Sequence, residues 1–317
     1  MKALLVIDLQ NDFLPGGPLG VPDADTLVPL VNELMAHYDL IVATQDWHPE
    51  NHGSFACNHS NNNIGDFVDL NGLSQILWPS HCIQNSLGAN FAPGLDTHRF
   101  TTVFRKGQNS KIDSYSGFFD NGHRKSTGLT DYLRAEQVTE VHLCGVATDY
   151  CVKFTALDAL QEGFKTVLLT DACKGVELQQ GDIEKALQEI ENAGGVLRTS
   201  NEVLPNTVTL FRPIGPNELL KLKELKFQAW PQRLPDQPIF YPVTNEKYAR
   251  QIAEEWNNPQ SGEGFVCRFQ LPRTYLEKYP RKIVGASHHE EWWIPAEDLE
   301  ELNSNLLGSI EILAETL

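Results

Sequence analysis

Short apolar runs, each followed at once by polar residues, recur along the first two thirds of the chain. Residues 2–7 (KALLVI) precede Asp8, and residues 40–44 (LIVAT) precede Gln45 and Asp46. Runs of this length with polar boundaries are typical of strands that are covered on both faces of a sheet. Four later segments predict further strands: residues 101–105, 141–144, 166–169 and 195–197.

Helical patterns separate these strands. Apolar residues recur at helical spacing in residues 25–37, and residues 128–135 and 182–193 also predict helices. Strands that alternate with helices predict an α/β fold, in which a parallel six-stranded sheet carries helices on both faces. Ligands bind to such sheets beyond the carboxyl ends of the strands. We therefore expect one crevice to collect the polar residues at these ends, which are Asp8, Asp46, Lys106 and Cys151.

Residues 141–160 (VHLCGVATDYCVKFTALDAL) predict a strand, a tight turn and a helix that begins at Asp149, with Cys151 in its first turn. The free N–H groups and the positive end of the helix dipole favour a thiolate at such a position, and they can also hold an oxyanion. A free cysteine is nevertheless more often a small, inert core residue. Cys151 is therefore expected to be a nucleophile only if neighbouring side chains activate it.

Asp8 and Lys106 are the expected activating neighbours of Cys151. A thiol near neutral pH needs a base or a cation to react, and Asp8 would accept the proton while Lys106 supplies the positive charge. Taken singly, Asp8 could be a loop cap and Lys106 a solvated surface charge. Their shared position at strand ends favours a triad of Asp, Lys and Cys.

A second group of polar residues indicates a metal site. Asp46 and His48 directly follow a predicted strand, and carboxylate with imidazole suits Zn²⁺, Fe²⁺ or Mn²⁺. Two ligands are too few, and His81 in the sequence WPSHCIQ is the expected third. Other side chains of this region are weaker candidates: His52, His59, Cys57 and Cys82.

Residues 49–98 lack strong periodicity and are rich in Asn, His and Pro. So long an irregular segment is usually functional. Trp78 lies within it, and together with Phe13 and Tyr115 it could form the wall of an aromatic substrate site. For any one of these aromatic residues, ordinary core packing is the commoner role.

The length of 317 residues predicts two domains, because domains usually hold about 100–200 residues. The strand–helix rhythm stops near residue 206, so we expect an α/β domain at residues 1–206 and a smaller α+β domain at residues 207–317. The net charge of −17 argues against nucleic acid and anionic membranes as partners. No apolar run reaches the ~20 residues of a membrane span, and the N-terminus lacks a signal peptide pattern, so a cytoplasmic location with reduced cysteines is expected.

Six motifs resemble those of the nicotinamidases in the isochorismatase-like (cysteine hydrolase) superfamily. They cover about residues 1–204 in the order and spacing of that family: VIDLQNDF (6–13), TQDWHPENHGSFA (44–56), WPSHCIQ (78–84), FRKGQNSKIDSYSGFFDN (104–121), GVATDYCV (145–152) and TDAC (170–173). The resemblance implies a role for each matching residue: Asp8, Lys106 and Cys151 as the catalytic triad, Asp46, His48 and His81 as metal ligands, the backbone N–H groups of Ala147 and Cys151 as the oxyanion hole, and Phe13, Trp78 and Tyr115 as substrate contacts. It also implies a cis peptide bond between Val146 and Ala147.

The implied activity is hydrolysis of nicotinamide to nicotinate and ammonia through a thioester on Cys151, in NAD salvage, with pyrazinamide as a further substrate. The metal, Zn²⁺ first with Fe²⁺ or Mn²⁺ as alternatives, would bind the pyridine nitrogen and orient the substrate. Isochorismatases that cleave a vinyl ether lack the cysteine, so Cys151 favours amide hydrolysis. Two alternatives stay open, namely a carbamoyl or ureido hydrolase of the same superfamily and a nicotinamide-binding sensor for the second domain. Assembly into a homo-oligomer also stays open.

Residues 207–317 depart from that family. They resemble small stand-alone bacterial proteins, particularly cyanobacterial ones, for which the resemblance implies no function. The combination of Arg212 with Glu290 and Glu291 resembles ADP-ribosyltransferase-like folds, although a structural role for Arg212 before Pro213 is the favoured explanation. The aromatic residues of this part would either form its own small core or cover the crevice of the first domain: Trp230, Phe240, Tyr241, Trp292 and Trp293.

Overall fold

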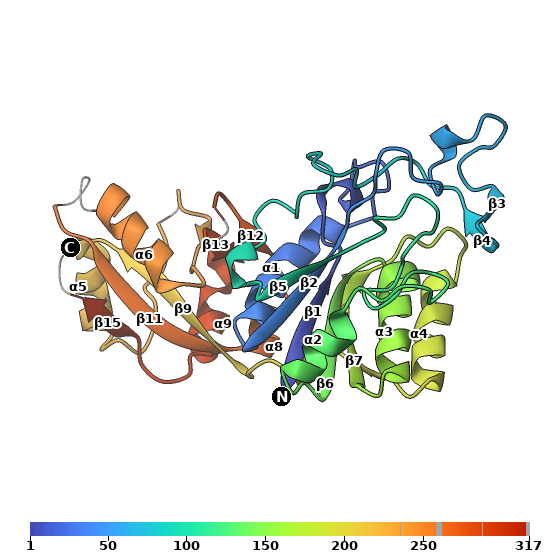
Figure 1. Cartoon of the computed structure of the whole chain (residues 1–317). Helices are drawn as coiled ribbons and strands as arrows, with labels where there is room; N and C mark the ends of the chain where they lie inside the picture. The colour runs from blue at the N-terminus through green and yellow to red at the C-terminus, as the bar shows by residue number, and fades with distance from the viewer. Residues whose placement is uncertain (235, 258–261, 287, 315–317) are drawn as a thin grey trace. The chain divides into compact units, whose positions relative to one another are not determined.

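The structure, a computed structural model, describes residues 1–234, 236–257, 262–286 and 288–314. The chain divides into two compact units, Met1–Val203 and Leu204–Leu317, each with its own secondary structure (Figure 1). Within the described ranges, no helix combines the length and the apolar character that crossing a bilayer requires. All six cysteines are free thiols.

The first unit is built around one parallel sheet of six strands in the order β5-β2-β1-β6-β7-β8. Its strands are β1 (Lys2–Ile7), β2 (Leu40–Asp46), β5 (Thr102–Lys106), β6 (Glu140–Val146), β7 (Lys165–Lys174) and β8 (Val196–Arg198). Each of the six strands predicted from the sequence is present, and the predicted α/β fold with a parallel sheet is confirmed. The central position of β1 and β6 places Asp8 and the turn before Cys151 next to each other.

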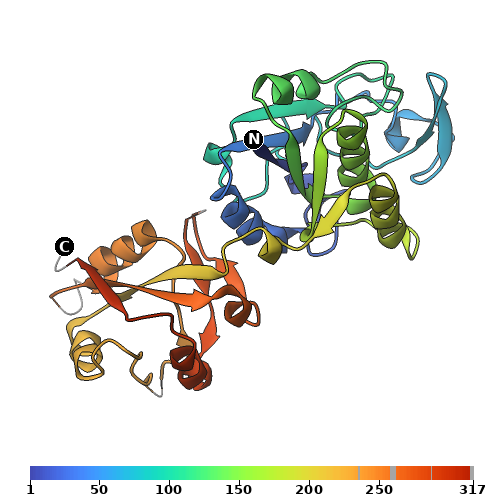
Figure 2. The ribbon, with the colours of Figure 1, turned by 90° about the horizontal axis from the view of Figure 1, so that it is seen from below.

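Helices cover both faces of this sheet. Figures 1 and 2 show α1 (Leu27–Met35) on one face and α2 (Leu129–Ala135), α3 (Lys153–Gln161) and α4 (Asp182–Asn192) on the other. Alternate residues of β1 serve the two layers, because successive side chains of a strand point to opposite faces. Leu5 and Ile7 belong to the core under α2 and α3, and Leu4 and Val6 are equally buried.

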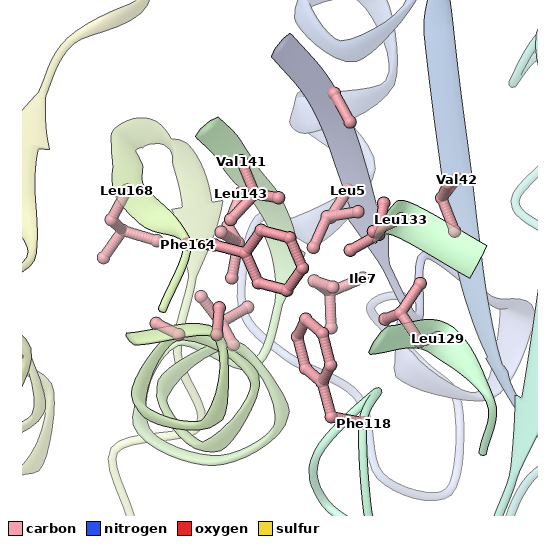
Figure 3. Close-up of a cluster of buried hydrophobic side chains, with 14 of the residues drawn as sticks. Leu5, Ile7, Val42, Phe118, Leu129, Leu133, Val141, Leu143, Phe164 and Leu168 are labelled. Carbon is pink, nitrogen blue, oxygen red and sulfur yellow. The ribbon is translucent and has the colours of Figure 1, made fainter. Parts of the chain in front are cut away.

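The core under α2 and α3 fixes the strand that carries Asp8. In Figure 3 the side chain of Ile7 lies near the ring of Phe118, with Leu129 and Leu133 of α2 beside them, and all four belong to one buried cluster. Full burial of a side chain such as Leu5 or Ile7 contributes about 1.5–3 kcal/mol to folding. This layer therefore holds the carboxyl end of β1 firmly in place.

The segment at residues 49–98, for which no strand was predicted, contains a β-hairpin. Strands β3 (Phe67–Leu70) and β4 (Leu73–Ile76) pair in antiparallel register around a turn at Asn71 and Gly72. Both turn residues have positive φ angles, 59° and 83°. Asn-Gly is the preferred sequence for such a two-residue turn, so the sequence did carry a signal for this hairpin.

The second unit has an antiparallel three-stranded sheet in the order β15-β11-β9, formed by β9 (Thr207–Ile214), β11 (Phe265–Pro272) and β15 (Glu311–Ala314). Two short pairs join β10 (Ile239–Phe240) to β14 (Ile294–Pro295) and β12 (Arg281–Ile283) to β13 (Glu290–Trp292). Its helices are α5 (Pro216–Glu224), α6 (Glu246–Ile252), α8 (Arg273–Leu276) and α9 (Leu299–Ser304). Trp230, Phe240 and Trp292 are buried in the core of this unit.

Candidate active site

Four polar side chains meet at the carboxyl edge of the parallel sheet. Asp8 follows β1, Asp46 ends β2, Lys106 ends β5, and Cys151 follows the turn after β6. All four are buried, with at most 7 % of their surface exposed. The structure therefore brings together the residues that the strand-end argument had selected, although no charge among them can be stabilised by bulk water.

Lys106 is the centre of this group. Its Nζ lies 2.8 Å from Oδ2 of Asp8, donates to Oδ1 of Asp46 at 2.6 Å, and lies 3.4 Å from Sγ of Cys151. It also donates to the carbonyl of Ser114 at 3.0 Å. Burial works against the charged form, but the two carboxylates outweigh it and raise the pKa of Lys106 well above its ordinary value. The lysine is therefore a permanent cation beside the thiol.

Asp8 is oriented by Thr44 of the neighbouring strand. The Thr44 hydroxyl donates to Oδ1 of Asp8 at 2.7 Å and accepts from the Asp8 backbone N–H at 3.2 Å. Burial raises the pKa of Asp8, while Lys106 and the Thr44 hydrogen bond act in the opposite direction. A raised pKa makes the carboxylate a stronger base than an exposed aspartate. The sequence argument did not identify Thr44.

Cys151 lies in a single π-helical turn, Thr148–Val152, that continues directly into α3. The predicted α-helix at Asp149 therefore begins four residues later, at Lys153. The expectation of a stabilised thiolate is also wrong for the resting site. Burial raises the pKa of Cys151 well above the ordinary value; Lys106 acts against this, and the nearby Asp8 and Asp46 act with it. The side chain is a thiol until a base takes its proton.

The backbone before Cys151 has the predicted conformation. The peptide bond between Val146 and Ala147 is cis. Ala147 and Cys151 both line a small pocket at the edge of the sheet. An acyl group bound in this pocket would therefore lie beside the sulfur and beside the backbone of these two residues.

Aromatic side chains form much of the wall of the same pocket. Phe13, Trp78 and Tyr115, the three predicted contacts, all line it. Tyr115 is held by two hydrogen bonds to its hydroxyl oxygen, from Nε1 of Trp78 at 3.1 Å and from Nε2 of Gln75 at 3.0 Å. Four other lining residues were not predicted from the sequence: Leu19, Asp113, Tyr150 and Val176. Tyr150 directly precedes the nucleophile and packs edge-on against Trp78 at 5.0 Å, so its position in the motif was the available signal.

Asp46, His48 and His81 place one ligand atom each within 4.8 Å of one another. The Nδ1 atoms of the two histidines hydrogen bond with the carbonyls of Gly107 (2.9 Å) and Pro79 (2.8 Å). A carbonyl only accepts, so each Nδ1 carries a proton, and each Nε2 lies toward the Asp46 carboxylate, at 3.5 Å for His48 and 3.8 Å for His81. Burial lowers the pKa of His48, but Asp46 outweighs it and raises that pKa, so a metal ion would bind Nε2 of His48 in place of a proton. Two imidazole nitrogens beside a carboxylate fit a divalent cation.

Gly107 makes room for this arrangement. It follows β5 with a φ of 65°, and a Cβ at this position would lie 2.2 Å from the ring of His48. The imidazole can therefore pack directly on the glycine backbone that accepts its Nδ1 proton. No side chain larger than hydrogen fits there without displacing His48.

The charges of this cluster depend on one another. Burial would raise the pKa of Asp46, but Lys106 and His48 hold it well below its ordinary value. Burial and the neighbouring His48 lower the pKa of His81 to about 4. At neutral pH His81 is therefore a neutral ring with its proton on Nδ1, which leaves the lone pair of Nε2 for a metal.

His52 lies beside this cluster and belongs to a second group that could hold a metal. Its ring centre is 4.5 Å from that of His48, and ligand atoms of His52, His48 and Asp113 lie within 4.8 Å of one another. Nδ1 of His52 accepts from the backbone N–H of Ser54 at 3.2 Å, and its buried Nε2 has no hydrogen-bond partner among the described residues. His59 instead hydrogen bonds through Nε2 with the carbonyl of Gly53 at 2.8 Å.

The first unit is similar in sequence and fold to known proteins. The isochorismatase domain family matches residues 2–202. The nicotinamidase of Escherichia coli (strain K12) is 48 % identical over 204 residues, which cover 62 % of this chain and 94 % of that protein.

Two solved structures share the fold of the first unit. PnC1 from L. infantum in complex with nicotinate has 38 % identity and a TM-score of 0.56 over 63 % of this chain and 93 % of its own. The pyrazinamidase of Pyrococcus horikoshii in complex with zinc has 40 % identity and a TM-score of 0.52 over 62 % of this chain and 98 % of its own. The chain belongs to the isochorismatase family.

Proposed function

We propose that this protein is a metal-dependent nicotinamidase that hydrolyses nicotinamide to nicotinate and ammonia. The observation that carries the proposal is that one pocket is lined by Cys151 and, beside it, by Asp46 and His81 of the metal-type cluster. A small molecule bound in this pocket would therefore contact both the nucleophile and the side chains that could hold a metal ion. The similarity to nicotinamidases along the whole first unit supports the same reaction. Its product places the enzyme in pyridine nucleotide salvage.

Acylation begins with proton transfer. Because the resting thiol has a raised pKa, Asp8 takes its proton as Sγ of Cys151 attacks the carboxamide carbon. Lys106, 3.4 Å from Sγ, stabilises the thiolate as it forms. The carbonyl oxygen becomes an oxyanion, for which the backbone N–H groups of Ala147 and Cys151 are the proposed donors.

Collapse of the tetrahedral intermediate breaks the C–N bond. Asp8 returns its proton to the leaving nitrogen, so ammonia departs as a neutral molecule and a thioester remains on Cys151. Asp8 then takes a proton from a water molecule, which attacks the thioester carbon. The C–S bond breaks, the thiol recovers its proton, and nicotinate is released.

Asp46, His48 and His81 are the proposed metal ligands. A divalent ion held by them would supply a Lewis acid for the ring nitrogen of the substrate and so orient the ring. Zinc is the proposed ion, supported by its presence in the pyrazinamidase of Pyrococcus horikoshii and by the mixed nitrogen and oxygen ligands. Fe²⁺ and Mn²⁺ suit the same ligands. Asp8 carries out the proton transfers.

An ammonia-release assay with three amides tests this function. We expect turnover of nicotinamide and pyrazinamide, which share a ring nitrogen and a planar carboxamide, and no comparable turnover of an N-carbamoyl amino acid. Preferred release of ammonia from the carbamoyl substrate would instead indicate a ureido hydrolase. Binding of nicotinamide without turnover by the metal-loaded protein would indicate a sensor and contradict the proposal.

A further inference from the structure

The second unit contains a pocket of about 740 Å³ whose residues have no part in the proposed reaction. Cavities that bind cofactors and drug-sized ligands measure about 300–1,000 Å³. Its wall comes from β9, α6, β13 and the loops beside them, and it combines charged, aromatic and apolar side chains. Of the adjacent acidic pair, Glu291 lines the pocket, whereas Glu290 pairs with Arg281 at 3.4 Å.

Two arginines at this pocket share a single carboxylate. Nε of Arg212 donates to Oε1 of Glu218 at 3.2 Å, and NH1 of Arg233 lies 3.6 Å from the same oxygen. The two guanidinium groups and one carboxylate leave this part of the wall with a net positive charge. Burial lowers the pKa of Arg233, and the charge of Arg212 lowers it further, which a bound anion would reverse.

Arg212 and Arg233 differ in their remaining contacts. Arg212 also donates to the carbonyl of Tyr241 at 3.3 Å and lies 4.4 Å from the centre of the Phe240 ring. These donors of Arg212 are therefore engaged in contacts within the protein. Among the residues that the structure describes, Arg233 makes no hydrogen bond, and its buried Nε has no partner. A guanidinium carries five N–H donors, and the side chain of Arg233 is 12 % exposed, so Arg233 is the natural contact for an anionic ligand group.

Aromatic rings form another part of the wall. Tyr241 and Trp293 meet edge to face with centres 5.5 Å apart, and both line the pocket. Nε1 of Trp293 donates to Oε2 of Glu291 at 3.1 Å, which fixes the indole. Tyr241 keeps 37 % of its surface exposed. A fixed aromatic pair that stays outside the core is suited to holding a flat ring.

Hydrogen-bond acceptors lie two strands away from Arg212. Val243 bridges Phe211 on one side and Glu291 on the other, so about 10 Å separates the backbone beside Arg212 from that of Glu291. The carboxylate of Glu291 accepts from the hydroxyl of Tyr248 at 2.9 Å as well as from Trp293. Each carboxylate oxygen has a second lone pair for a ligand hydroxyl or amino group.

We propose that this pocket binds a nucleotide, with its phosphate on Arg233, its base against Tyr241 and Trp293, and its hydroxyl or amino groups on Glu291. A nucleotide supplies an anion, a flat ring and several donors on one molecule. A free aromatic amino acid carries the same three kinds of group, and a titration with free tryptophan distinguishes the two.

Calorimetric titration of the full-length protein tests the site with AMP, adenosine and inorganic phosphate. We expect AMP to bind at least about 10-fold more tightly than adenosine or phosphate, because each of these lacks one of the two main contacts. Nicotinamide mononucleotide and NAD⁺ then show whether a pyridine base is preferred to a purine. Binding of all three nucleotides no tighter than that of adenosine or phosphate would overturn the proposal, and so would tighter binding of free tryptophan.

Variants locate the binding in this pocket. Arg233→Gln should weaken AMP at least about 10-fold while leaving adenosine unchanged, since only the phosphate contact is lost. Arg268→Gln is the matched control, because Arg268 is an exposed arginine of the same unit that pairs with Glu311 outside the pocket. Tyr241→Leu, at a partly exposed position, should weaken AMP and adenosine alike. Unchanged AMP affinity in both R233Q and Y241L would place the nucleotide elsewhere and refute the site.

Discussion

The ammonium of Lys106 lies 2.8 Å from a carboxylate oxygen of Asp8, and both side chains are completely shielded from solvent. The same ammonium donates to Asp46, so one cation joins the proposed base to the proposed metal site. Removing one partner of such a buried pair typically costs about 3–5 kcal/mol, because the other charge is left uncompensated. Lys106 therefore holds the base and the metal cluster in a fixed relation to the thiol.

Replacement of the nucleophile should abolish catalysis and leave the fold intact. We expect Cys151→Ala to lower kcat for nicotinamide by at least ~10³-fold, because no covalent intermediate can form. Cys144→Ala is the matched control, since Cys144 is a buried cysteine of β6 outside the pocket. It should keep its activity. Residual turnover of C151A near the wild-type rate, in protein free of wild-type enzyme, would end the thioester mechanism.

Loss of the Thr44 hydroxyl should change the pH profile. The hydrogen bond from Thr44 lowers the pKa of Asp8, so Thr44→Val raises that pKa. Asp8 works as a base in its carboxylate form, and the acid limb of kcat/KM should therefore move to higher pH. At a neutral pH the loss of a hydrogen bond to a charged group should reduce kcat/KM by about 10-fold.

Thr44→Ser separates this effect from a packing defect. Serine keeps the hydroxyl that contacts Asp8 but loses the methyl group, so the wild-type acid limb should return. A profile of T44V that falls in height without moving along the pH axis would show that Thr44 acts on the structure and not on the base.

Metal content should follow the three proposed ligands. His48→Ala and His81→Ala should each lose the bound ion and most of the activity, because two protein ligands hold a divalent ion poorly. His59→Ala is the control, as its Nε2 contacts a backbone carbonyl away from the cluster. Elemental analysis of the purified proteins gives the ratio of ion to chain. If H48A and H81A both retain about one ion per chain, the ligand assignment is wrong.

The sequence was sufficient to locate the polar residues at the strand ends, because strand position alone determines which edge of the sheet they occupy. The sequence could not predict which of these side chains carry a proton. The expectation of a thiolate at Cys151 relied on the helix terminus, whereas burial of the thiol has the largest effect on its pKa and raises it, Lys106 acts against this, and Asp8 and Asp46 add to it. The burial of the thiol and its distances from the charged side chains depend on packing between segments that are distant in the chain.

The remaining differences have separate causes. The hairpin turn at Asn71 and Gly72 was readable from its sequence but was overlooked within a polar region. The π-turn at Cys151 was not readable, because a π-turn and an α-turn differ only in hydrogen-bond register. Thr44 could not be found either, since its role depends on the pairing of β1 with β2.

The second unit is expected to be dispensable for hydrolysis, because every residue that lines the first pocket lies before residue 177. A chain that ends after Val203 keeps the capping box between Thr199 and Glu202 and the hydrogen bond from Ser200 to Asp171 at 2.7 Å. A cut near residue 206 would instead retain Pro205, whose carbonyl accepts from Arg273 of the second unit. We expect the shorter protein to fold and to hydrolyse nicotinamide with a kcat similar to that of the full-length protein, measured by ammonia release alongside size-exclusion chromatography. A soluble, monodisperse product that has lost most of its activity would mean that residues 204–317 complete the active site or an assembly on which it depends.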